Sequence, residues 1–249
     1  MSITLIPING LPAVAPGDDL ATLLGDAMEA LARPAVDGDV VVVCQKVVSK
    51  AEGRIVRLDE VEPSGPALDF AHSYGKDARL VEVALQQATE VLRMRDGHLI
   101  TATGPGFVAA NSAVDRSNQN GDDEVTLLPE DADLSALRLR QALSGRFGVD
   151  LALIVSDTFG RAWRLGQVDL AVGAAGLEVV DDQEGGLDLG GRRLEHTRMA
   201  VADQIAAAAG LLMVKAGAVA AVIVRGLAYR RGEAKASDLL RPACDDLFR

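Results

Sequence analysis

Asp157 is the residue of this sequence whose position most clearly suggests chemistry. It follows the apolar residues 151–155 closely, and Thr158 comes next. A carboxylate at the end of a buried strand lies where α/β sites commonly collect ligands, and oxygen ligands suit Mg²⁺. Arg161 and Arg164 follow and could bind phosphate. The spacing leaves an alternative equally open, in which Asp157 caps a turn and pairs with Arg161 on the surface.

A second group of polar side chains occupies residues 109–120, a segment that leaves an apolar strand and contains Asp115 and Asn118. Asp and Asn in such loops usually bond nearby backbone groups, so turn chemistry is the more ordinary explanation. A metal ligand at Asp115 is the functional alternative.

The third group is the pair Asp203 and Gln204, which are the only polar residues of the segment 199–214. A helix that is apolar all round is buried, and a buried carboxylate is costly unless something compensates its charge. One of the pair should therefore meet a cation, a metal or a network of hydrogen-bond donors. The alternative is that both lie on a narrow strip that faces solvent.

Together the three groups are what a one- or two-metal phosphoryl-transfer site would use. Lys46 and Lys50 lie just beyond the β-branched run 40–44, where an ammonium could meet phosphate as a point charge. A solvated loop lysine is an equally good interpretation of Lys46. The sequence contains no GxxxxGK[ST], GxGxxG, HExxH or GxSxG motif, so the commonest nucleotide-binding and hydrolase templates are absent.

The composition excludes several classes of function. The 249 residues carry 36 acidic and 25 basic side chains, a net charge of -11, and only 3% aromatic residues, so nucleic-acid binding is not expected. The first residues lack a signal-peptide pattern and no apolar stretch is long enough to span a membrane, which predicts a cytoplasmic protein without membrane contact. Two cysteines are too few for a disulfide framework.

The elements that must position these residues alternate irregularly between strands and helices. Strands are predicted at residues 3–8, 40–44, 54–58, 151–155 and 219–224, a hairpin around 104–106, and helices at 18–32, 68–74, 77–95, 134–147 and 199–214. This irregular order favours an α+β fold of mixed sheets with packed helices, not a Rossmann or P-loop fold. We expect one domain over residues 1–249, with a division into two subdomains left open.

Several longer motifs, in this order, resemble the coenzyme F420-0:L-glutamate ligase family nearly from end to end. The matching segments are Gly-Leu-Pro at 10–12, Gly-Asp-Val-Val-Val-Val at 38–43, Lys-Val-Val-Ser-Lys-Ala-Glu-Gly-Arg at 46–54, Val-Asp-Arg-Ser-Asn at 114–118, Leu-Leu-Pro at 127–129, Ser-Asp-Thr-Phe-Gly-Arg-Ala-Trp-Arg at 156–164, Val-Gly-Ala-Ala-Gly at 172–176, and Ala-Val-Ala-Asp-Gln-Ile-Ala-Ala-Ala at 200–208. Some bacterial relatives carry a further, flavin-reductase-like domain, and we expect the ligase module alone here.

The resemblance implies a homodimeric enzyme that uses GTP to join L-glutamate to the coenzyme F420 precursor through an acyl phosphate. It further implies two divalent cations, Mg²⁺ or Mn²⁺, with K⁺ as an additional candidate. Asp115 and Asp157 would be metal ligands, and Thr158 and Gln204 would serve a second metal. The residues implied as GTP contacts are Leu11, Pro12, Ala13, Val14, Gln45, Lys50 and Asn118.

The departures from the family pattern lie mostly at or near the residues that the resemblance implies as GTP contacts. Ala13 and Val14 follow Pro12 where the family often has Glu and an apolar residue, Gln45 stands where serine is frequent, and Ala113 where glycine is common. Two other functions stay open. One is another GTP- or ATP-dependent carboxylate–amine ligase or phosphotransferase on the same scaffold, and the other is a non-catalytic binding homologue.

Overall fold

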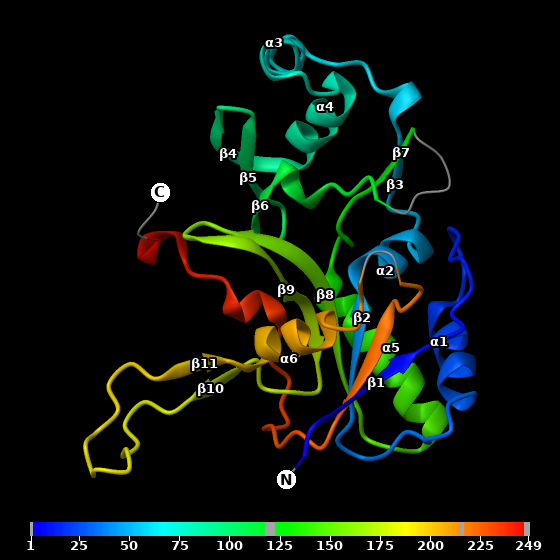
Figure 1. Cartoon of the computed structure of the whole chain (residues 1–249), viewed down its shortest axis with the longest axis vertical. Coiled ribbons are helices and arrows are strands. Elements are labelled where there is room, and N and C mark those ends of the chain that lie inside the picture. The colour runs from blue at the N-terminus through cyan, green and yellow to red at the C-terminus, as the bar shows by residue number, and fades with distance from the viewer. Residues whose placement is uncertain (1, 118–122, 215–216, 247–249) are drawn as a thin grey trace.

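A five-stranded mixed sheet forms the centre of the protein in the computed structural model, which describes all residues except 1, 118–122, 215–216 and 247–249 (Figure 1). The strand order is β1-β12-β2-β8-β9, and β2 and β8 are the one parallel pair among the described strands of this sheet. Their bounds are β1 Thr4–Ile8, β2 Val40–Cys44, β8 Ala152–Arg161, β9 Arg164–Ala175 and β12 Ala221–Arg225.

Helices cover both faces of this sheet because its central strands are apolar on both sides. Val41 and Val43 face the core shared with α1 (Leu20–Glu29), α2 (Gln45–Ala51) and α5 (Ala132–Phe147). Val40 and Val42 face the core shared with α6 (Val201–Gly210). All four valines are fully buried, so this sheet is the rigid base of the molecule.

A smaller group of elements stands beyond one end of the sheet and has its own apolar clusters (Figure 1). It comprises α3 Gly65–Tyr74, α4 Ala78–Gln87, the pair β3 Ile55–Arg57 and β7 Glu124–Thr126, and the sheet of β4 Ala88–Arg95, β5 His98–Thr103 and β6 Val108–Ala110. At the other side β10 (Val180–Asp182) and β11 (Arg198–Ala200) begin an arm that projects from the body.

The α+β class is confirmed, and most elements begin and end near the predicted residues. Three differ. The predicted helix 199–214 spans only Val201–Gly210, because residues 198–200 pair with β10 as β11. The predicted helix 77–95 ends at Gln87, because residues from Ala88 on pair with β5 as β4. Residues from Gln45 form α2, where the sequence indicated only a polar exit from the strand. Among the described residues, every helix is too short or too polar to cross a membrane.

The position of Asp157 also needs a correction. It does not end its strand, because β8 continues to Arg161 and pairs with β9 as a long hairpin. What ends here is the neighbouring strand, since Cys44 of β2 lies opposite Ser156 and the chain then turns into α2. Asp157 is therefore the first residue of β8 without β2 beside it, which opens space next to its side chain.

Candidate functional site

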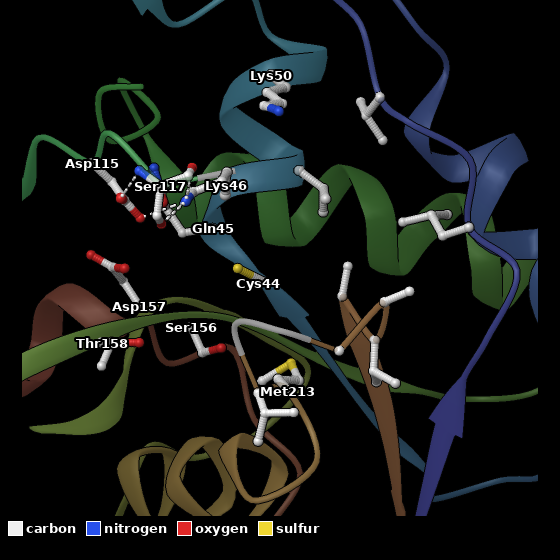
Figure 2. A pocket seen from close by; sticks show the side chains of 18 of the residues that line it. Cys44, Gln45, Lys46, Lys50, Asp115, Ser117, Ser156, Asp157, Thr158 and Met213 are labelled. Atoms are coloured by element: carbon white, nitrogen blue, oxygen red, sulfur yellow. Dashed lines mark hydrogen bonds and ion pairs between the residues drawn. The ribbon is translucent and has the colours of Figure 1, made fainter. Parts of the chain in front are cut away.

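A cavity of 340 Å³ lies at the carboxyl end of β2, where that strand turns into α2 (Figure 2). Its volume falls in the range of small-molecule sites, about 300–1,000 Å³. Apolar residues form one side and polar or charged residues the other. Its lining comprises Leu11, Pro12, Ala13, Val14, Cys44, Gln45, Lys46, Val47, Lys50, Asp115, Ser117, Ser156, Asp157, Thr158, Asp169, Met213, Val214, Gly217, Ala218, Val219 and Ala220.

Helix α2 brings both lysines to this cavity. Gln45 at its first turn is buried, and its side-chain amide donates to the backbone oxygen of Leu127 at 2.9 Å and to the hydroxyl of Ser49 at 2.6 Å. The bond to Leu127 ties the start of α2 to the segment that follows β7, and the bond to Ser49 lies within the helix. Lys46 and Lys50 are four residues apart and so share one face of α2.

Lys46 joins this helix to the segment that carries Asp115. Its ammonium lies 2.7 Å from the Asp115 carboxylate, and it also donates to the hydroxyl and the backbone oxygen of Ser117. The backbone N–H of Ser117 in turn donates to Asp115 at 2.7 Å. Burial raises the pKa of Asp115, but the bonds from Lys46 and Ser117 outweigh it and keep that pKa below its ordinary value. The alternative of a solvated Lys46 is wrong.

The backbone just before Asp115 is strained. Asn111, Ser112 and Ala113 have φ of 51°, 54° and 56°, a left-handed conformation that side-chain-bearing residues rarely adopt. The buried hydroxyl of Ser112 holds it in place, since it donates to the backbone oxygen of Ala84 at 2.6 Å and lies 2.7 Å from the hydroxyl of Thr101. Strain of this kind concentrates at functional sites, and it explains why glycine suits the position of Ala113.

Asp157 lies on the same side of the cavity as Asp115 and below it in Figure 2. Burial raises its pKa to about 7; the backbone N–H of Thr158 opposes this shift, and the carboxylates of Asp115 and Asp169 add to it. The Thr158 hydroxyl donates to Asp169 at 2.7 Å. Among the described residues no ion pair joins Asp157 to Arg161, so the surface-pair alternative is wrong.

These side chains fit a hard divalent cation. The donors that converge are carboxylate and hydroxyl oxygens, which Mg²⁺ and Mn²⁺ prefer, and a buried carboxylate with a raised pKa gains most from a nearby positive charge. Within the described part of the chain, no three Asp, Glu, His or Cys side chains are close enough to enclose a metal on their own. Phosphate and water oxygens would have to complete the shell, as is usual for Mg²⁺.

Asp203 and Gln204 lie on α6 and are not among the described residues that line the cavity. Asp203 accepts a hydrogen bond of 3.0 Å from the backbone N–H of Ala171, so a donor compensates its half-buried charge and ties α6 to β9. Gln204 is exposed and is not among the described residues that line the cavity. Its assignment to a second metal stays a prediction.

Six of the seven residues implied as nucleotide contacts line this one cavity, although they come from two distant segments: Leu11, Pro12, Ala13, Val14, Gln45 and Lys50. Asn118 lies outside the described residues. As lining residues, sequence reasoning missed Ser117 and Asp169, and also Met213, Val214 and residues 217–220. Asp169 could have been found from the β8–β9 hairpin, because it stands directly across from Thr158.

Comparison with known proteins gives a consistent result. A sequence model of the F420-0:Gamma-glutamyl ligase family matches residues 10–226. The chain is 44% identical to the coenzyme F420:L-glutamate ligase of Methanothermobacter thermautotrophicus, with 100% of each chain covered. It is 43% identical to that of Methanopyrus kandleri, over 95% of this chain and 93% of the relative. It is 40% identical to that of Archaeoglobus fulgidus, over 100% of this chain and 97% of the relative.

Proposed function

Because the chain belongs to the F420-0:Gamma-glutamyl ligase family, we propose that it uses GTP to join L-glutamate to the coenzyme F420 precursor through an amide bond. The observation that carries the proposal is the pairing of Lys46 with Asp115 beside the buried Asp157 in a cavity of nucleotide size. This cavity therefore contains basic groups that would bind a triphosphate and carboxylates that would bind its cations.

The chemistry requires a carboxylate to be activated before an amine can displace its oxygen. We propose that the precursor carboxylate takes the γ-phosphate of GTP, which releases GDP, and that glutamate then displaces the phosphate. Asp115, Asp157 and Thr158 would hold Mg²⁺ or Mn²⁺, which neutralises charge on the transferring phosphate. Lys46 fixes Asp115 in place, and Lys50 contacts phosphate. Two cations, a further K⁺ and a cytoplasmic location belong to the same proposal.

The direct test incubates the protein with GTP, Mg²⁺, L-glutamate and the coenzyme precursor and reads the product by mass. We expect a product heavier by one or more glutamate residues, together with GDP and phosphate. Replacement of GTP by ATP should lower the catalytic efficiency, and equal efficiency would remove the GTP preference. GDP release only with another carboxylate or amine would favour a different ligase, and no turnover with any acceptor would favour a binding protein.

Lys50→Ala is expected to raise the Michaelis constant for GTP about tenfold, because one charged contact to phosphate is worth about 1.5–3 kcal/mol before solvent screening reduces it. Burial and the neighbouring Lys46 lower the pKa of Lys50, and a bound phosphate would favour its charged form. Initial rates over a GTP series check this. An unaltered constant would exclude Lys50 from the GTP site.

We also propose that two copies of the chain form a homodimer. Large apolar side chains are exposed at the tip of the β8–β9 hairpin, where Leu165 is 97% exposed, and on the arm between β10 and β11, where Leu187 is 70% exposed. Exposed apolar groups of this size are typical of interaction surfaces.

Leu187→Ser combined with Leu189→Ser is therefore expected to shift the protein from dimer to monomer in light scattering. Leu211→Ser, at a leucine that is 74% exposed on the body of the protein, is the matched control and should leave the mass unchanged. A double variant that stays dimeric would remove the arm from the interface.

A further inference from the structure

A second cavity adjoins the first and shares part of its wall. It has a volume of 190 Å³, and Asp115, Asp157 and Thr158 line both cavities. The remaining wall comes from the strained segment before Asp115 and from the β8–β9 hairpin. Its other lining residues are Ala109, Ala110, Asn111, Ala113, Val114, Phe159, Gly160 and Gln167. The carboxylates therefore lie between two separate spaces.

The size of this second cavity limits what it can hold. It lies below the range of about 300–1,000 Å³ that is typical of drug-sized ligands, whereas the first cavity lies within that range. A nucleotide or a fused-ring cofactor precursor exceeds it, and a free amino acid is of suitable size. Of the two spaces, this one suits the smallest substrate of the proposed reaction.

The polar groups of the second cavity favour a particular end of that substrate. Its described lining includes two carboxylates and the side-chain amides of Asn111 and Gln167, and no Lys, Arg or His. Asp115 and Asp157 would be neutralised by the cation of the proposed function, so the acceptors left for an ammonium are the amide oxygens of Asn111 and Gln167. A carboxylate or phosphate finds no cationic side chain in the described lining. The first cavity, by contrast, contains both lysines of α2.

We propose that the second cavity binds the amino-acid substrate with its amino group toward the amide oxygens of Asn111 and Gln167, an inference that rests on the proposed ligase function. The amine then approaches the acyl phosphate from the side opposite the nucleotide. Its nitrogen forms the C–N bond, the bond between the acyl carbon and the phosphate oxygen breaks, and phosphate leaves with the electron pair. Of the two protons that the ammonium loses, one goes to the departing phosphate and one to solvent.

Gly160 offers a test that leaves the shared carboxylates untouched. Gly160 lines the second cavity, a Cβ added there meets no atom within 4 Å, and the residue is in β8, so we expect leucine to fit the strand and to occupy cavity space. We expect Gly160→Leu to raise the Michaelis constant for L-glutamate about tenfold or more and to leave that for GTP within about twofold. Gly145→Leu, at another glycine with open space but outside both cavities, is the matched control.

The charge of the bound group is tested at Gln167. Gln167→Lys should raise the Michaelis constant for L-glutamate, and Gln167→Glu should not. The reverse result would show that a carboxylate of the substrate faces Gln167 and would overturn the proposal. Calorimetric titration of glutamate into the wild type and Gly160→Leu tests the glutamate site separately from the ligase function. Weaker glutamate binding in the variant supports the site in the second cavity even if the wild type forms no product. Equal glutamate binding and equal Michaelis constants for glutamate in the two proteins would exclude that site.

Discussion

Asp157→Asn is expected to reduce the rate of ligation at least about a hundredfold, or about 2.7 kcal/mol of transition-state stabilisation, while the fold stays intact. The side chain lines both cavities and lies beside Asp115 and Asp169, so its charge acts where phosphate and metal charges would meet. Asparagine keeps the shape and one acceptor oxygen but loses the negative charge that attracts a cation. Product mass and initial rates at saturating Mg²⁺ measure the loss.

The same substitution should change stability in the opposite direction. The pKa of Asp157 is 3.8 in its ordinary state and about 7 in the fold. Between these pH values the folded protein binds more protons than the unfolded chain, so the free energy of unfolding of the metal-free wild type falls as pH rises from about 4 to about 7. An asparagine side chain does not titrate in this range. We therefore expect Asp157→Asn to melt at a higher temperature than the wild type at pH 8 without metal.

Added Mg²⁺ distinguishes a ligand from a merely buried carboxylate. It should raise the melting temperature of the wild type at pH 8 and have much less effect on Asp157→Asn. Asp203→Asn is the matched control, because Asp203 is half buried and accepts a backbone hydrogen bond but lies outside both cavities. More than half of wild-type activity in pure Asp157→Asn, or an equal response to Mg²⁺, would show that Asp157 is not a ligand.

Sequence reasoning identified Asp157 but misplaced it, and the reason is physical. Apolar residues 151–155 indicate a buried strand, and the polar Ser156 and Asp157 suggest its end. Strand length depends on partners, however, and β9 continues the pairing to Arg161 after β2 has ended at Cys44. The hydrophobic pattern indicates which residues are buried on both faces of the sheet, but it does not show how far a hairpin extends beyond the other strands.

The site as a whole could be predicted only where local sequence carries the signal. The β-branched run of β2 predicts its buried strand, and residues 11–14 of the early turn all reach one cavity. The second cavity could not be predicted, because it depends on three left-handed residues from Asn111 that a buried hydroxyl of Ser112 holds in place. Such a conformation is fixed by tertiary contacts with Ala84 and Thr101, which no local pattern contains.

Lys46→Ala is expected to have the second large effect, and for a different reason from Lys50→Ala. The side chains of Lys46 and Asp115 are 11% and 26% exposed and 2.7 Å apart, so removal of the ammonium takes its ion pair away from a largely buried carboxylate. The bonds to Ser117 are lost as well. We expect the free energy of unfolding to fall by about 1–3 kcal/mol, less than for a fully buried pair because Asp115 keeps some contact with water.

Activity should fall at least about a hundredfold in Lys46→Ala, since Asp115 would no longer be fixed beside Asp157. Lys50→Ala is the matched comparison: it removes the same group from the same face of α2, one turn later, and should mainly raise the Michaelis constant for GTP. Equal effects of the two variants on stability and on kcat would show that Lys46, like Lys50, only contacts phosphate.

A double-mutant cycle with Asp115→Asn decides whether Lys46 acts through Asp115. If the ammonium positions that carboxylate, the losses of stability and activity in Lys46→Ala and Asp115→Asn are not additive, and the coupling in stability should reach about 0.5–3 kcal/mol. The double variant should then be little worse than the poorer single variant, because each change already breaks the same ion pair. Additive losses would mean that the two charges act independently, and would reduce the contact between α2 and Asp115 to a packing interaction.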